Sequence, residues 1–227
     1  MSGIIDAYCE RAGPELWAEP VNLVTNLAFL VAAAAAARRF AATPGLSLRN
    51  GWDIAVLIAL LAAIGVGSAL WHAFARPWAA LADTVPILLF IGVFLASFLY
   101  RVAQLGTPAI VALFALFQAA NFGIGGVFPP ETLNGSIFYS PAWLGLALLA
   151  LGLALRRAAL APRFAASWAL FTVSLALRTV DQAVCAAFPL GTHFLWHLLN
   201  ALLLYLLVDA LIRSRGAGPG TGSVTRA

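Results

Sequence analysis

Histidine is rare in this chain, yet two of its three histidines stand four residues apart in an apolar stretch. His193 and His197 occur in "GTHFLWHLLN", and His72 occurs far upstream in "GSALWHAF". Side chains at positions i and i+4 lie on one face of a helix, so His193 and His197 can bind the same metal ion. With His72 as the third ligand, the set has the composition of a catalytic zinc site, in which three protein ligands leave one coordination position open.

Two other interpretations of the histidines stay open at this level. Each histidine could be a packing residue at a helix end that hydrogen-bonds to a neighbour. Alternatively, two of them could bind a haem between helices and leave the third unused. The metal site is favoured if all three side chains reach the same depth of the fold, which depends on the helices that carry them.

Asp83 and Ser68 are the candidate catalytic residues beside the histidines. Asp83 follows His72 after a short "ARPW" turn, and an ionisable group inside an apolar segment is usually functional or paired. We expect Asp83 to accept a proton from the attacking water. Ser68 precedes His72 by one helical turn and is expected to stabilise an oxyanion. The structural alternatives are a salt bridge of Asp83 with Arg76, a helix cap, or a backbone hydrogen bond of Ser68.

The composition places these residues in a membrane protein. Of the residues, 63% are hydrophobic and only 10% are charged, and the mean hydropathy is +0.94. A soluble domain of this size needs a larger charged surface. The apolar stretches also lack the period-two alternation of a β-barrel. The composition therefore predicts an all-α integral membrane protein.

Seven apolar segments are long enough to cross a bilayer, which takes about 20 residues in a helix. They cover residues 20–37, 53–74, 81–100, 107–126, 138–155, 164–187 and 191–212. We predict a single seven-transmembrane-helix bundle over residues 1–212, with residues 1–19 as an acidic segment outside the membrane. A disordered cytoplasmic tail is expected at 213–227. With alternating directions, the three histidines, Ser68 and Asp83 all reach the same side of the membrane.

The arginines set the expected orientation. Every basic residue of the chain is an arginine, and ten of the thirteen lie in loops or the tail on the side opposite to the histidines. These ten are Arg38, Arg39, Arg49, Arg101, Arg156, Arg157, Arg163, Arg213, Arg215 and Arg226. Because positive residues favour the cytoplasmic side, we expect the C-terminus inside a bacterial cell membrane and the N-terminus and histidines outside. The net charge of +4 then reflects topology and not nucleic-acid binding.

Other polar residues of these segments have structural interpretations. Arg178 and Asp181 are spaced for an ion pair on one helix face. Thr25, in the stretch "NLVTN", belongs to a polar stripe expected to hydrogen-bond to a neighbouring helix. Cys9 and Cys185 both fall on the outer side, where a pair of cysteines is typical of a disulfide, with two buried thiols as the alternative.

Several of these stretches occur in the order of the motifs of a known family. They are "YCER", "LWAEPVNLVTNLAF", "GSALWHA", the Asp83 of "LADTVP", "RTVDQAVC" and "THFLWHLL". The sequence resembles the alkaline ceramidases, which belong to a superfamily of seven-helix proteins that includes the adiponectin-receptor-like proteins. The similarity covers residue 6 to about residue 210, and it looks like that of a bacterial member. Ser-x3-His, an Asp eleven residues later and a final His-x3-His form a specific combination.

The resemblance implies both a cofactor and a reaction. It implies zinc held by the three histidines, with Ser68 and Asp83 as catalytic residues. Members of the family hydrolyse the amide bond of ceramide to sphingosine and a fatty acid. We therefore expect a zinc-dependent intramembrane amidase that acts on ceramide or a related acyl-amide lipid. Tyr139 and Trp196 are expected to line the acyl pocket, with packing or anchoring at the membrane interface as the alternative.

The resemblance also implies a calcium site in the acidic N-terminal segment. Asp6, Glu10 and Glu19 resemble three of its ligands, and oxygen ligands suit Ca²⁺. However, "DAYCERA" departs from the family pattern Asp-Trp-Cys-Glu-Glu-Asn, because one extra residue separates Asp6 from Cys9 and Arg11 stands in place of a glutamate. These changes should weaken a cation site, and the alternative is a solvated acidic cap.

Two functions of other classes remain open. The chain could be a receptor or membrane-perturbing protein of the same superfamily that keeps the metal for structure. It could also be a haem-binding electron carrier, which is the function that the haem interpretation of the histidines implies. In each case the membrane is the expected partner, and in the amidase a lipid is the expected substrate.

Overall fold

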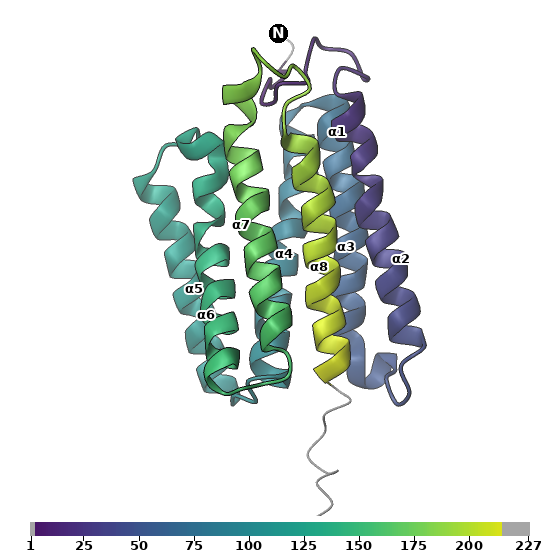
Figure 1. The fold of residues 1–227 in the computed structure, drawn as a ribbon, viewed down its shortest axis with the longest axis vertical. Coiled ribbons are helices and arrows are strands. Elements are labelled where there is room, and N and C mark those ends of the chain that lie inside the picture. Colours follow the sequence, from purple (N-terminus) through teal and green to yellow (C-terminus); the bar gives the residue numbers. More distant parts are fainter. Residues whose placement is uncertain (1–2, 215–227) are drawn as a thin grey trace, which may run out of the picture.

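The structure, a computed structural model, describes residues 3–214 and contains helices but no strand in that range. The elements are α1 (Pro20–Thr25), α2 (Leu27–Ala41), α3 (Leu48–Phe74), α4 (Pro77–Arg101), α5 (Thr107–Val127), the 3₁₀ helix η1 (Thr132–Tyr139), α6 (Ser140–Leu155), α7 (Ala161–Val184) and α8 (His193–Ser214). The helices run side by side along the long axis, and the N-terminal segment lies across one end (Figure 1). The predicted all-α fold is confirmed.

The helix starts follow from local sequence signals. Five helices, α1, α4, α5, α6 and α7, carry a proline in their first two positions, where the missing N–H has no partner to lose. Ser47 and Asn50 form a reciprocal capping box at the start of α3. This cap explains why α3 begins at Leu48, ahead of the predicted start at residue 53.

Six helical segments of the described chain are long and apolar enough to cross a membrane. They are Pro20–Ala41, Leu48–Phe74, Pro77–Arg101, Thr107–Val127, Thr132–Leu155 and His193–Ser214. Helix α7, which corresponds to the predicted segment 164–187, is not among them, and it carries the charged residues Arg163, Arg178 and Asp181. It nevertheless packs against α6 and α8 as a full member of the bundle (Figure 1).

The C-terminal boundary differs slightly from the prediction. Helix α8 continues to Ser214, so residues 213–214 belong to the helix and not to the expected tail. The remainder of that predicted tail, 215–227, lies outside the described residues.

The outer faces of the bundle are apolar, as a lipid environment requires. Large side chains such as Val31, Phe122 and Leu155 are more than two-thirds exposed. A soluble monomer rarely exposes such a surface over many helices, because the contact with water is unfavourable. The structure is therefore an all-α membrane bundle.

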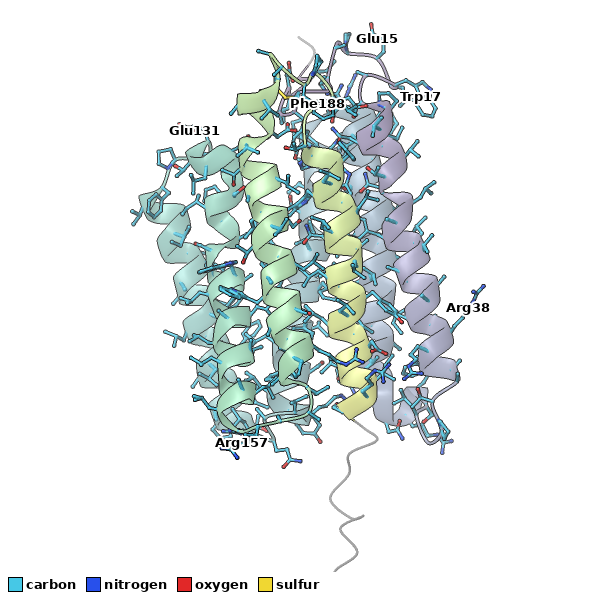
Figure 2. The ribbon with its side chains drawn as sticks, viewed as in Figure 1. Glu15, Trp17, Arg38, Glu131, Arg157 and Phe188 are labelled. Carbon is cyan, nitrogen blue, oxygen red and sulfur yellow. A yellow bond between two sulfur atoms is a disulfide. The ribbon has the colours of Figure 1, made fainter. Side chains whose placement is uncertain are left out.

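Ion pairs around one buried carboxylate lie at the end of the bundle that is rich in arginine. The carboxylate of Asp209 in α8 is buried and accepts hydrogen bonds from Arg39 (3.2 Å), Arg163 (3.2 Å) and Arg213 (2.6 Å). These arginines come from α2, α7 and α8, so one carboxylate joins three helices. Figure 2 shows Arg38 and Arg157 at this end, and Glu15, Trp17, Glu131 and Phe188 at the other.

The opposite end is covered by residues 3–19, which we call the N-terminal segment. Its Ile5 N–H donates to the carbonyl of Ala75 in the turn between α3 and α4 (2.8 Å). The Glu10 carboxylate accepts the N–H groups of Val21 (2.6 Å) and Asn22 (2.8 Å) and so caps α1. The structure places Cys9 in a disulfide with Cys185, just after α7, with their Cα atoms 5.3 Å apart.

Asp181 joins this segment to the two last helices. Its carboxylate is only 1% exposed and accepts the backbone N–H groups of Cys9 (3.1 Å), Thr192 (2.6 Å) and His193 (2.9 Å). The predicted ion pair between Asp181 and Arg178 is therefore wrong, since backbone donors occupy both carboxylate oxygens. Gly191 has φ +66°, and a side chain there would collide with Asp181 and lie 2.7 Å from the Cβ of Cys9.

A close approach of α3 and α4 brings the predicted catalytic residues together. Pro86 lacks the N–H that would bond the carbonyl of Ala82, four residues earlier in α4. Gly67 of α3 packs against this carbonyl, and a Cβ at Gly67 would overlap it and lie 3.1 Å from the backbone nitrogen of Asp83. The next residue of α3 is Ser68, which thus reaches the side chain of Asp83.

We predict that Gly67→Ala lowers the stability of the bundle by about 1–3 kcal/mol, because the added methyl group pushes α4 away. The measurement is the thermal unfolding midpoint of the detergent-solubilised protein. Gly152→Ala in α6 is the control, since nothing lies within 4 Å of a Cβ there and alanine is the better helix former. Equal midpoints for the two variants would contradict the close approach.

Candidate metal centre

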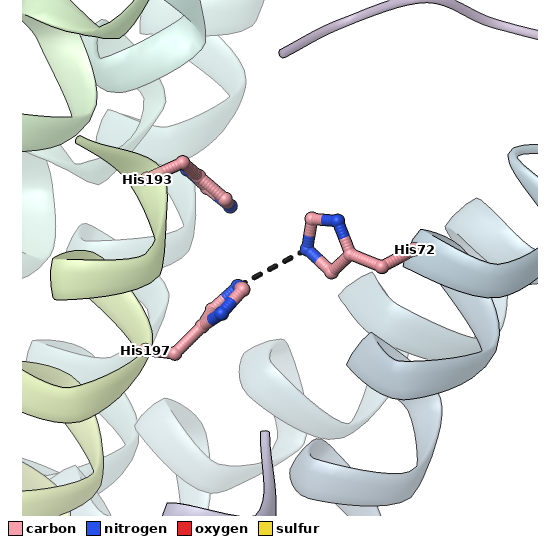
Figure 3. A group of neighbouring side chains, drawn as sticks. All are labelled: His72, His193 and His197. Atoms are coloured by element: carbon pink, nitrogen blue, oxygen red, sulfur yellow. Dashed lines mark hydrogen bonds between the residues drawn. The ribbon is translucent and has the colours of Figure 1, made fainter. Parts of the chain in front are cut away.

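The three histidines lie together at the end of the bundle covered by the N-terminal segment. His72 is in the last turn of α3, and His193 and His197 are in the first turns of α8. All three are at most 2% exposed, and one nitrogen of each lies within 4.8 Å of the others. The three rings face a common point (Figure 3). The three side chains therefore lie at the same end of the bundle although they come from two separate helices, as the sequence predicts.

Hydrogen bonds at Nδ1 fix the orientation of two of these rings. The Glu19 carboxylate accepts from Nδ1 of His72 (2.6 Å). Thr25 donates its hydroxyl hydrogen to the carbonyl of Val21 (2.7 Å), so its oxygen accepts from Nδ1 of His197 (2.9 Å). Each Nε2 therefore carries a lone pair, which is how an outer carboxylate or hydroxyl fixes the tautomer of a metal ligand.

The geometry fits a divalent metal ion. The Nε2 atoms of His72 and His197 lie 3.1 Å apart, and two lone pairs at this distance repel unless a cation lies between them (Figure 3). Two nitrogens at about 2.0–2.1 Å from a tetrahedral zinc are about 3.3 Å apart, close to the spacing here. His193 differs from the other two histidines: its Nδ1 is buried and has no hydrogen-bond partner among the described residues.

Arg11 contacts both Glu19 and the backbone of His72. Its guanidinium donates to Glu19 (2.5 Å), to the carbonyl of Gly13 (3.1 Å) and to the carbonyl of His72 (2.8 Å). Burial raises the pKa of Glu19, and Arg11 and the Asn22 amide partly offset that effect by stabilising the carboxylate. Arg11, Glu19 and His72 thus form one buried chain of charged and polar groups.

The predicted calcium ligands do not assemble in this structure. Asp6 is exposed, Glu10 caps α1, and Glu19 is bonded to His72 and Arg11. Between residues 3 and 214, the histidines are the only group of three His, Cys, Asp or Glu residues close enough to hold an ion. The physical reason is the arginine: the positive charge of Arg11 occupies the side of Glu19 where a cation would bind.

Ser68 and Asp83 line a chamber of about 160 Å³ together with His193 and His197. The hydroxyl of Ser68 lies beside the carboxyl of Asp83. Asp83 lies in the second turn of α4, whose N-cap is Arg76, and no ion pair joins it to Arg76 in the described structure. The two structural alternatives for Asp83, a helix cap and a salt bridge, therefore do not apply.

Tyr8 covers the three histidines with its ring, a role that the sequence pattern did not indicate. Its ring stacks on His193 with the centroids 3.8 Å apart, and it lies 5.1 Å from the ring of His72. Burial raises the pKa of the Tyr8 hydroxyl, which stays protonated and bonds to Trp71. The only sequence signal was its position next to Cys9, whose disulfide and hydrogen bond to Asp181 fix this part of the chain.

An apolar cavity of about 110 Å³ lies next to the chamber within the bundle. The two share lining residues, among them Phe29, Ile64 and Ile87. Tyr139 and Trp196, the predicted pocket residues, line both spaces, with their rings 5.0 Å apart. Apart from these two and Asn200, the walls of the apolar cavity are hydrocarbon side chains of the kind that accommodate an acyl chain.

Arg178 is a further residue of the chamber that sequence reasoning assigned to another role. Its guanidinium donates to the carbonyl of Asn134 and to Ser136 Oγ (3.1 Å), both in η1. It lies 5.5 Å from the ring of Tyr139 and 5.6 Å from that of Trp196. The sequence signal for a role in the chamber was the presence of a charged residue inside an apolar segment.

Comparison with known proteins gives no family assignment. No protein-family model matches the chain, and no curated protein matches it. What the site can do is therefore argued from its own residues.

We predict that Glu19→Gln weakens zinc binding by about 10- to 100-fold, because the amide holds Nδ1 of His72 less firmly and leaves Arg11 uncompensated. Zinc affinity is measured by competition with a chromogenic chelator. Glu15→Gln is the matched control, since Glu15 is exposed in the same segment. Unchanged affinity in Glu19→Gln would show that Glu19 does not position the ligand.

Proposed function

We propose that this protein is a zinc-dependent intramembrane amidase that hydrolyses an acyl-amide lipid of the ceramide type to a fatty acid and an amine. The observation that carries the proposal is the cluster of three buried histidine rings, two of which line a chamber that shares walls with an apolar cavity. The order of motifs that resembles the alkaline ceramidases supports the same reaction and a bacterial membrane location.

Zinc is the metal that the ligand set suits best. Three neutral imidazoles and an open position are typical of catalytic zinc, whereas calcium prefers oxygen ligands. A haem between His72 and His197 is disfavoured, because their Nε2 atoms are only 3.1 Å apart, too close for an iron with the two nitrogens on opposite sides.

Different residues of the chamber would carry out different parts of the reaction. When bound, zinc would polarise the amide carbonyl and lower the pKa of a coordinated water to about 7. Asp83 would accept a proton from the attacking water as its oxygen bonds to the amide carbon, and would pass that proton to the leaving nitrogen as the C–N bond breaks. Ser68 would donate its one O–H to the Asp83 carboxylate before the attack, and could turn that hydrogen to the developing oxyanion once Asp83 carries the proton.

The proposal also implies a position for the lipid. The acyl chain would extend into the apolar cavity, past Tyr139 and Trp196, while the amide remains between Asp83 and the histidines. The N-terminal segment and the ring of Tyr8 close the chamber toward the end of the bundle. Access from the membrane side is consistent with a substrate that is itself a lipid.

We further propose that α7 crosses the membrane as a seventh span, with the N-terminus outside and the C-terminus in the cytoplasm. Its charged residues are turned to protein partners or to the chamber: Arg163 bonds to Asp209, Asp181 accepts backbone N–H groups, and Arg178 lines the chamber. Low hydropathy is therefore compatible with a spanning position, because these groups avoid lipid.

The orientation predicts different labelling of two single cysteines placed at the ends of α7. Phe188→Cys should react with an impermeant maleimide added to intact spheroplasts, and Arg157→Cys should react only after permeabilisation. Figure 2 shows that these positions lie at opposite ends of the molecule. The native cysteines are joined in a disulfide and do not react. Labelling of both variants from the same side would contradict a spanning α7.

For the reaction, we predict that the purified zinc-loaded protein releases fatty acid from a panel of N-acyl lipids and loses this activity with a chelator. His197→Ala should lose zinc and activity together. Asp83→Asn should keep zinc but lower turnover by about 10²- to 10⁴-fold, the usual contribution of a general base. Glu131→Gln, an exposed carboxylate at the same end, is the control. Zinc binding without turnover of any acyl amide would instead favour the receptor of the same superfamily.

A further inference from the structure

Arg178 is a cation inside the chamber without a carboxylate beside it. Among residues 3–214 no Asp or Glu oxygen lies within ion-pair distance of its guanidinium. The nearest candidate along the helix, Asp181, is occupied by three backbone N–H groups. Asp83, also on the chamber wall, interacts with Arg178 electrostatically but forms no ion pair with it.

The guanidinium is nevertheless held in one orientation. One edge is fixed by the bonds of Nη1 to Asn134 and Ser136, and Asn134 in return donates its amide to the carbonyl of Arg178 (3.0 Å). The rings of Tyr139 and Trp196 lie against it. Nε and Nη2 have no acceptor among the described residues, so the second edge of the guanidinium is left without a partner.

Arg178 is only partly buried, so the free edge of its guanidinium is accessible to a ligand. A charged side chain within a membrane protein is unfavourable without a partner, and it usually marks a substrate path. The planar edge formed by Nε and Nη2 matches two oxygens of a carboxylate or phosphate group. The four residues that hold the guanidinium, Asn134, Ser136, Tyr139 and Trp196, would be needless if it served only as a counter-charge, which a flexible lysine provides.

We propose that Arg178 binds a carboxylate on the amine side of the substrate, so that the preferred substrates are N-acyl amino acids and not neutral ceramides. The proposal rests on the proposed amidase function. Arg178 lines the chamber but not the apolar cavity, so an acyl chain in that cavity leaves the amine portion beside Arg178. The chamber of about 160 Å³ suits a small anionic head group such as that of an N-acylglycine.

Binding is tested with probes that cannot be hydrolysed as amides. N-hexadecylsulfonylglycine and its neutral carboxamide, N-hexadecylsulfonylglycinamide, differ only in the charged group. We expect the zinc-loaded wild-type protein to bind the carboxylate about 10- to 100-fold more tightly, the factor that one charge-assisted pair supplies. The corresponding phosphonate is the third probe, and tighter binding of it than of the carboxylate would overturn the assignment to amino acids.

Three variants test whether Arg178 is responsible. Arg178→Gln should abolish the preference, and Arg178→Lys, which keeps the charge but not the planar edge, should reduce it several-fold. Arg76→Gln is the matched control, because Arg76 is exposed at the same end and does not line the chamber. Equal binding of the two probes by the wild type, or a full preference in either Arg178 variant, would overturn the proposal. If Arg178→Gln fails to retain zinc, the lysine variant decides.

Turnover of N-palmitoylglycine and N-palmitoylglycinamide separates the two proposals. A carboxylate preference in binding with no turnover of any acyl amide would overturn the amidase and leave the anion site in place. Turnover of both substrates at equal efficiency, without a binding preference, would overturn the role of Arg178 and leave the amidase in place. Preferential turnover of N-palmitoylglycine, lost in Arg178→Gln, supports both.

Discussion

The buried carboxylate of Asp181 is the interaction on which the metal end of this protein depends. It accepts three N–H groups from two parts of the chain that are distant in sequence: Cys9 in the N-terminal segment, and the consecutive residues Thr192 and His193 at the start of α8. Hydrogen bonds to a charged acceptor are stronger than those between neutral groups, and an unpaired buried carboxylate would be very unfavourable. The position of His193 and the roof formed by Tyr8 both follow from this one group.

The two ends of the bundle use buried aspartates in different ways. At the arginine end, Asp209 joins helices through the side chains of three arginines. At the histidine end, Asp181 joins segments through backbone donors and so needs no positive side chain. Arg11 beside His72 is paired with Glu19. The histidine end therefore has no network of arginines around a shared carboxylate, unlike the other end.

The sequence predicted the features of this site that depend on periodicity and alternation. The i, i+4 spacing of His193 and His197, and the return of His72 to the same end, follow from helix geometry and the order of apolar segments. The roles of Glu19 and Arg178 could not be predicted in this way. Glu19 meets His72 only because the N-terminal segment folds across the bundle. The pairing of Arg178 with Asp181 failed because distant backbone donors compete for the carboxylate.

The order of synthesis determines when the three histidines can come together. His72 is synthesised long before His193 and His197, and Cys9 finds its partner 176 residues later. A nascent chain that ends before α8 therefore has only one of the three histidines. The insertion of α8 brings the three side chains together, so a product truncated before this helix has no histidine cluster. The candidate metal site can therefore form only late in synthesis.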